Sequence, residues 1–166
     1  MRYATIRKID IQNGPGVRVS LFTQGCPIQC EGCFNSEIWD FDGGKEWTAE
    51  TKKHFLELCN KPQIAGISIL GGEPLVEQNL EALEDLLKTF KQRHPHKTVW
   101  LWTGFVFESL NISQLKVLNY VDVLVDGPWV MSLGDFSLKY RGSSNQRILD
   151  VQKSIEKGKA ILKDIE

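Results

Sequence analysis

Three of the four cysteines in the chain, Cys26, Cys30 and Cys33, lie close together in the stretch GCPIQCEGCFN. Thiolates are the ligands that zinc and iron–sulfur clusters prefer. The spacing C-x3-C-x2-C, with Pro27 and Gly32 between the thiols, allows one short loop to fold around a compact metal group. A cubane iron–sulfur cluster held entirely by protein takes four thiolates, so three from one loop leave one iron free for an exogenous ligand. Such an open position is typical of a catalytic site.

Two other interpretations of these cysteines stay open. The three thiols could hold a structural zinc with Cys59 or a histidine as the fourth ligand, or Cys59 could complete the four-thiolate cluster of an electron carrier. Cys59 falls on the apolar face of a predicted helix, where free cysteine commonly acts as a small buried hydrophobe. None of the histidines (His54, His94, His96) has a spacing that completes a zinc motif.

A second motif, GGEP at residues 71–74, follows the apolar run IAGISIL. The run is short enough to be a buried strand. Gly71 and Gly72 lack side chains, so they allow a backbone to approach a ligand closely. Taken alone, however, a GGEP tetrapeptide most often forms only a turn.

The elements that position these motifs alternate between strands and helices. Strands are predicted at ATIRKIDIQ and VRVSLFTQ on either side of NGPG, then at IAGISIL, TVWLW and VDVLV, with RILDV as a possible last strand. Between them, apolar spacing predicts a helix that Thr48 caps and that ends before Pro62, a second from Leu80 to residue 90, and a third across Leu110 to Leu118.

Alternating strands and helices imply parallel pairing, and hence an α/β fold whose sheet is buried on both faces. The loops CPIQCEGC, GGEP, TGF and DGP each follow a predicted strand, and such sheets place ligand sites at the carboxyl ends of their strands. A full eight-stranded barrel needs about 250 residues. We therefore expect residues 1–166 to form a single domain built as a partial, open β/α barrel with a mostly parallel sheet.

The composition excludes several classes of function. Twenty Lys and Arg balance 21 Asp and Glu, so no basic excess points to nucleic acid. No apolar run approaches the roughly 20 residues that span a bilayer, and the N-terminus lacks the apolar region of a secretory signal. We expect no membrane partner and a cytoplasmic protein, where reducing conditions favour metal or redox roles for clustered cysteines over disulfides.

Together, the cysteine motif and GGEP in this order resemble the radical SAM superfamily. The resemblance implies a partial barrel in which Cys26, Cys30 and Cys33 hold a [4Fe-4S] cluster and S-adenosylmethionine binds the free iron. An electron from the reduced cluster then cleaves S-adenosylmethionine to methionine and a 5′-deoxyadenosyl radical. It further implies that Gly71 and Gly72 contact the methionine moiety and that Glu73 meets its amino group.

The same resemblance places an adenine contact beside the last cysteine. The superfamily often has an aromatic residue immediately before that cysteine, and here Gly32 occupies the position. Cys33 and its neighbours Gly32 and Phe34 are therefore included among the cofactor-binding residues, with Phe34 as the candidate replacement for the missing ring.

A closer resemblance, to the activating proteins of anaerobic ribonucleoside-triphosphate reductase, extends from about residue 10 to residue 150. The segments that carry it include CEGCFN, WDFDGGKE, VDVLVDGPW and RGSSNQR. It implies an enzyme, an oxidoreductase whose substrate is the large reductase subunit, on which it generates a glycyl radical under anaerobic conditions. A flavodoxin-like or ferredoxin-like protein would donate the electron.

Three alternatives to that activity remain at this point. The radical chemistry could act on another glycyl-radical enzyme, or on a small molecule as in 7-carboxy-7-deazaguanine synthase. A metal-stabilised module for binding or electron transfer would involve no catalysis.

Other polar residues at strand ends each have two interpretations. Thr103 and Gly104 could contact the cofactor or could cap a helix and form a turn, and Asp126 could bind the cofactor's ribose or amino end or cap the turn at Gly127. The polar cluster of Arg141, Ser143 and Asn145 is typical both of binding loops and of solvated loops. The tryptophans at positions 39, 47, 100 and 102 favour packing over cofactor contact.

Overall fold

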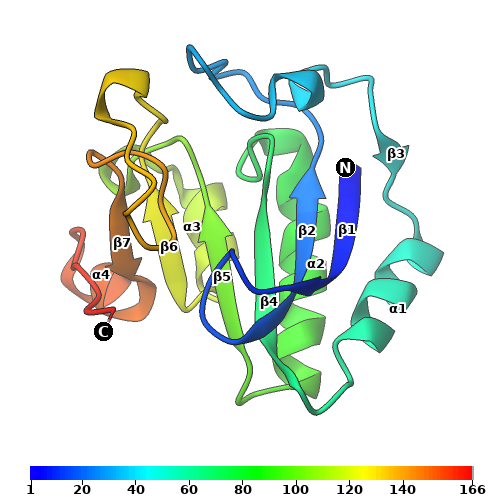
Figure 1. Cartoon of the computed structure of the whole chain (residues 1–166). Helices are drawn as coiled ribbons and strands as arrows, with labels where there is room; N and C mark the ends of the chain where they lie inside the picture. Colours follow the sequence, from blue (N-terminus) through cyan, green and yellow to red (C-terminus); the bar gives the residue numbers. More distant parts are fainter. Residues whose placement is uncertain (166) are drawn as a thin grey trace.

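The computed structural model describes residues 1–165, and within them seven strands form one mixed sheet in the order β3-β1-β2-β4-β5-β6-β7 (Figure 1). Strands β2, β4, β5 and β6 pair in parallel, whereas β1 and β7 pair antiparallel to β2 and β6. The α/β class, the mostly parallel sheet and the open, partial-barrel architecture are therefore confirmed. The strands are β1 (Arg2–Asp10), β2 (Val17–Thr23), β3 (Lys45–Glu46), β4 (Ile64–Gly71), β5 (Thr98–Trp102), β6 (Val123–Asp126) and β7 (Arg147–Asp150).

The helices are α1 (Ala49–Leu58), α2 (Glu77–Arg93) and α3 (Ile112–Leu118). In Figure 1, α2 and α3 lie behind the sheet and α1 lies beside β1 at its edge, and all three helices contribute residues to the main hydrophobic core. As predicted, Thr48 caps α1, its hydroxyl accepting the N–H of Thr51 at 3.2 Å. Short 3-10 turns are η1 (Ser36–Ile38), η2 (Phe107–Ser109) and η3 (Met131–Leu133). Among residues 1–165, no helix is both long and apolar enough to cross a membrane.

The prediction that the last strand extends through residue 151 was wrong at its end. Strand β7 stops at Asp150, and helix α4 (Val151–Lys157) begins at once. The carboxylate of Asp150 accepts the backbone N–H of Lys153 at 3.1 Å, which is the N-cap bond that starts a helix.

Successive side chains of the inner strands point to opposite faces of the sheet, and both faces are buried. On the helix side, Val19, Leu21, Ile67, Ile69, Val99 and Leu101 belong to the main hydrophobic core. On the opposite, concave face, β2 and β4 carry the buried polar residues Arg18, Ser20 and Ser68, and β5 carries Trp100.

The lower half of the concave face is closed around Arg18, which is fully buried. Its guanidinium donates to Ser68 Oγ, to the carbonyl oxygens of Pro15 and Ile67, and to both oxygens of Thr98. Burial lowers the Arg18 pKa to about 10. Segment 10–16 crosses in front of the strands here (Figure 1), and Asn13 accepts a bond from the Ser68 hydroxyl. The upper half of the face, at the carboxyl ends of the parallel strands, contains a cavity instead.

Candidate active site

The cysteine loop starts directly after β2, so a strand of the sheet fixes where it begins. The backbone N–H groups of Gly25 and Cys26 donate to the carbonyl oxygens of residues 38 and 39, at 2.8 and 3.1 Å. At its far end, the N–H of Asn35 donates to the sulfur of Cys33 at 3.4 Å. The start of the loop is therefore tied to residues 38 and 39, and the bond from Asn35 stabilises the local turn at the last cysteine.

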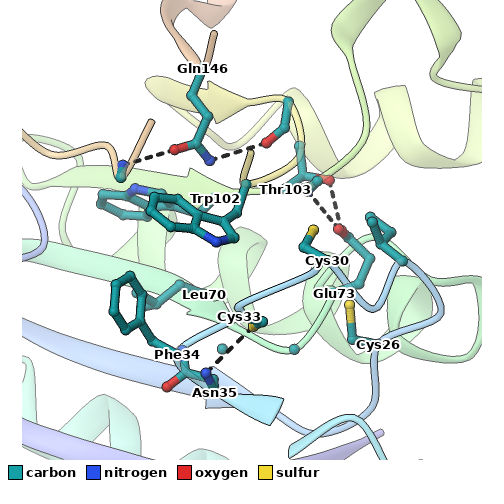
Figure 2. A pocket seen from close by; sticks show the side chains of 17 residues that line it. Cys26, Cys30, Cys33, Phe34, Asn35, Leu70, Glu73, Trp102, Thr103 and Gln146 are labelled. Atoms are coloured by element: carbon teal, nitrogen blue, oxygen red, sulfur yellow. Dashed lines mark hydrogen bonds between the residues drawn. The ribbon is translucent and has the colours of Figure 1, made fainter. Parts of the chain in front are cut away.

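The thiols of Cys26, Cys30 and Cys33 border one cavity of about 220 Å³ (Figure 2). Each of the three residues is partly exposed, so an entering group can reach it. No three or more His, Cys, Asp or Glu side chains within residues 1–165 converge closely enough to enclose a single metal ion. The thiols instead border a shared cavity, where each would bind a separate iron atom of a cluster.

The GGEP turn forms the wall next to the thiols, because β4 lies parallel to β2 and ends beside it. The N–H of Gly72 donates to Thr23, and that of Glu73 donates to Gly25, both at 2.8 Å. Gly71 has φ +110°, a backbone conformation that residues other than glycine rarely adopt. Both motifs singled out in the sequence therefore meet through backbone hydrogen bonds at the cavity.

Glu73 lines the cavity and is almost completely buried. Its carboxylate accepts the N–H of Leu75 (2.9 Å), the hydroxyl of Thr103 (2.7 Å) and the N–H of Gly104 (2.7 Å). Burial raises the pKa of Glu73, and these hydrogen bonds oppose the rise. Glu73 thus joins the ends of β4 and β5. Its carboxylate oxygens can accept further hydrogen bonds, and contact with a cofactor amino group stays a prediction.

Thr103 and Gly104 also line the cavity, so the structure brings them together with Glu73 and the cysteines. A Cβ built at Gly104 would overlap the Cδ1 atom of Ile28, in the cysteine loop. Gly104 therefore permits the close packing of this loop against the end of β5.

Asp126 is one of two predicted cofactor residues that do not line the cavity; the other is Gly32. Asp126 is fully buried and does not border the cavity, although its neighbour Gly127 does. Its two oxygens bind the Arg147 guanidinium, with Oδ1 at 2.9 Å from Nε, and Oδ2 also accepts the N–H of Phe107 at 2.8 Å. Asp126, together with Glu108, raises the pKa of Arg147. This arrangement ties β6 to β7 and to η2.

We therefore expect Asp126→Asn to lower stability and to leave cofactor affinity within about threefold of the wild type. The amide offers one acceptor oxygen where two are used, so the unfolding free energy should fall by about 2 kcal/mol. Denaturant unfolding and titration of the reconstituted protein with S-adenosylmethionine measure the two quantities. A large loss of affinity at unchanged stability would instead place Asp126 in contact with the cofactor.

The two residues beside the last cysteine have different positions. Gly32 is not among the cavity residues, and a Cβ there would lie 2.7 Å from Met131 Sδ, so its absent side chain lets η3 pack on the loop. Phe34 borders the cavity, with its ring centroid 5.2 Å from that of Trp129. An adenine contact by Phe34 stays a prediction.

Sequence reasoning missed part of the opposite wall. Trp102 lines the cavity at the end of β5, and its indole N–H donates to the Tyr140 carbonyl at 2.8 Å, whereas Trp100 is buried lower on the same face. Figure 2 shows Phe34 and Trp102 on one side of the cavity and the sulfurs of Cys26 and Cys30 on the other. The position of Trp102 at a strand end was the signal that could have identified it. Trp129 and Gln146 come from an aperiodic segment that gave none.

The polar cluster predicted in that segment holds the segment itself together. Arg141 donates to the Gln146 carbonyl at 2.6 Å, and Asn145 donates to the Pro128 carbonyl at 2.8 Å. Ser143 is buried and accepts the N–H of Val130. These bonds shape the loop that carries Trp129 to the cavity wall.

Cys59 is separated from the site. It is fully buried in the main core at the end of α1, and its thiol donates to the Phe55 carbonyl. Burial raises the Cys59 pKa to about 12, so a thiolate is strongly disfavoured there. The donor set at the cavity, three thiols of one loop, fits a cluster that has a position open to a further ligand.

Comparison with known proteins agrees with this donor set. Residues 12–149 match the family model described as a 4Fe-4S single cluster domain. The chain is 43% identical over 148 residues to the anaerobic ribonucleoside-triphosphate reductase-activating protein of Enterobacteria phage T4, covering 89% of this chain and 93% of the relative. Proteins of the same name from Vibrio cholerae and Escherichia coli K12 are each 39% identical, over 89% and 88% of this chain and 97% and 96% of theirs.

Proposed function

The chain belongs to the family of anaerobic ribonucleoside-triphosphate reductase-activating proteins, and we propose that its cavity is where it generates a glycyl radical on that reductase. It is a radical SAM enzyme of the oxidoreductase class, with a [4Fe-4S] cluster and S-adenosylmethionine as cofactors. The observation that carries the assignment of the site is the meeting of the cysteine loop and the GGEP turn at one cavity.

The protein's residues position and enclose the cofactors. Cys26, Cys30 and Cys33 would hold the cluster, and the backbone of Gly71 and Gly72 would face the methionine end of S-adenosylmethionine. When bound, the cluster and S-adenosylmethionine supply one-electron chemistry that ends in removal of a hydrogen atom from a glycine of the reductase. Phe34 and Trp102 line this cavity, and a bound segment of the reductase would complete the exclusion of water that a radical transfer requires.

The electron must come from outside the chain. The three cysteines are partly exposed, so a cluster held by them would be within reach of a small donor protein at the open edge of the sheet. A flavodoxin-like or ferredoxin-like donor is the proposal that fits this exposure. A reducing, anoxic compartment such as the cytoplasm is the location we propose, since an exposed cluster with an open iron is readily oxidised.

The test combines the anaerobically reconstituted protein with S-adenosylmethionine, dithionite and purified anaerobic ribonucleoside-triphosphate reductase. We expect 5′-deoxyadenosine to form and a glycyl radical to appear on the reductase by electron paramagnetic resonance. Reconstitution that yields only bound zinc would overturn the proposed chemistry. Cleavage of S-adenosylmethionine without any radical on the reductase would overturn the proposed substrate.

A further inference from the structure

Exposed aromatic side chains gather beside the cofactor cavity. Phe136 is 97% exposed and Phe34 is 66% exposed, values unusual for phenylalanine. The Phe34 ring centroid lies 6.3 Å from that of Phe136 and 5.2 Å from that of Trp129. We call Phe34, Trp129 and Phe136 the aromatic rim. It joins the cysteine loop to the segment after β6.

The aromatic rim borders a second, open cavity of about 850 Å³. This cavity lies next to the cofactor cavity, because part of its wall also borders that cavity. The shared residues are Phe34, Asn35, Leu70, Trp102, Trp129 and Gly142. A segment lying in the larger cavity would therefore contact side chains that also border the cofactor cavity.

We propose that the aromatic rim and the second cavity receive the glycine-bearing segment of the reductase, an inference that rests on the proposed function. A hydrogen atom can be removed from a glycine only when the backbone carrying it comes into near contact with the reacting group. The substrate is a polypeptide, and the second cavity is several times larger than the cofactor cavity it adjoins. Apolar side chains exposed at the entrance to a groove mark a surface that a partner covers.

The wall offers both apolar and polar surfaces to a polypeptide. The indole Nε1 of Trp129 is buried and has no hydrogen-bond partner within residues 1–165. Trp129 lines both cavities, but the burial of Nε1 keeps this atom away from their surfaces, so the indole ring offers a docked segment its apolar surface. Lys139 and Arg141 border the second cavity as well, so additional polar contacts are available to the segment.

Phe136→Ala tests the proposal because the side chain lines the second cavity and not the first. We expect the reductase concentration needed for half-maximal glycyl radical formation to rise roughly tenfold to hundredfold, as for loss of one buried phenylalanine ring. Formation of 5′-deoxyadenosine without reductase should equal that of the wild type. Ile112→Ala, which shortens a 76% exposed side chain at the start of α3, is the matched control and should change neither value.

A cross-linking measurement identifies the occupant directly. With p-benzoylphenylalanine at position 136, irradiation in the presence of the reductase should attach the chain to the peptide that contains the radical glycine, whereas the same group at position 112 should not. Cross-links to other parts of the reductase, or wild-type activation kinetics for Phe136→Ala, would overturn the docking site while the wild-type enzyme still forms the radical. Absence of the radical with the wild type would overturn the proposed function itself.

Discussion

Replacing Cys33 by alanine is expected to abolish both cluster retention and glycyl radical formation, whereas replacing Cys59 leaves both in place. Cys33 lies at the cavity with Cys26 and Cys30, and two thiols cannot hold a cluster that needs three protein ligands beside its open position. Cys59 is fully buried in the core, and its thiol bonds to a backbone carbonyl of its own helix. Its loss should cost only about 1 kcal/mol of stability.

Iron and sulfide analysis of the reconstituted variants measures cluster retention, and electron paramagnetic resonance measures both the reduced cluster and the radical on the reductase. Cys26→Ala and Cys30→Ala should behave like Cys33→Ala. Loss of iron from Cys59→Ala in a folded protein would reveal a fourth thiolate ligand. That result would support the electron-carrier interpretation that the spacing alone left open.

The sequence predicted the part of the fold that follows from regular patterns. Apolar runs and glycine-containing loops located the strands, and the parallel pairing of β2, β4 and β5 then placed the cysteine loop and GGEP at one edge. Thr48 was identified as a cap because threonine is among the residues preferred at helix starts, where its hydroxyl accepts a backbone N–H. These features depend on local chemistry and on the periodicity of strands and helices.

The other part of the site depends on contacts between residues distant in sequence. Pairing of Asp126 with Arg147 requires β7 to return antiparallel beside β6, and no pattern in the sequence specifies that direction. Segment 128–146 is shaped by side-chain bonds to its own backbone, such as that from Asn145 to Pro128, so it has no period to detect. The wall that includes Trp129 was therefore not predictable from the sequence.

Glu73 shows how a motif residue can be identified while its contacts are not. The GGEP motif located Glu73 directly after a predicted strand, and the resemblance implied a contact with the cofactor. The structure adds that the carboxylate bonds to Thr103 and Gly104 at the end of β5. Because such bonds cross between loops, only the three-dimensional arrangement reveals that Glu73 also positions its neighbours.

Alanine at Gly72 is expected to reduce glycyl radical formation about a hundredfold, since displacement of a positioned group by about 1 Å can cost that much. A Cβ at this position would overlap the carbonyl oxygen of Gly25 and lie 2.9 Å from its carbonyl carbon. That carbonyl accepts the N–H of Glu73, so the clash would separate the GGEP turn from the start of the cysteine loop. Affinity for S-adenosylmethionine should fall together with activity.

Gly158→Ala provides the control for the general effect of an added methyl group. Gly158 has φ +65° at the end of α4, and no atom lies within 4 Å of a Cβ placed there. This variant should lose about 1 kcal/mol of stability from backbone strain and keep full activity. Titration with S-adenosylmethionine and the radical assay on the reductase compare the two variants. If Gly72→Ala retains wild-type affinity and radical yield, the close backbone contact between the two loops does not position the cofactors.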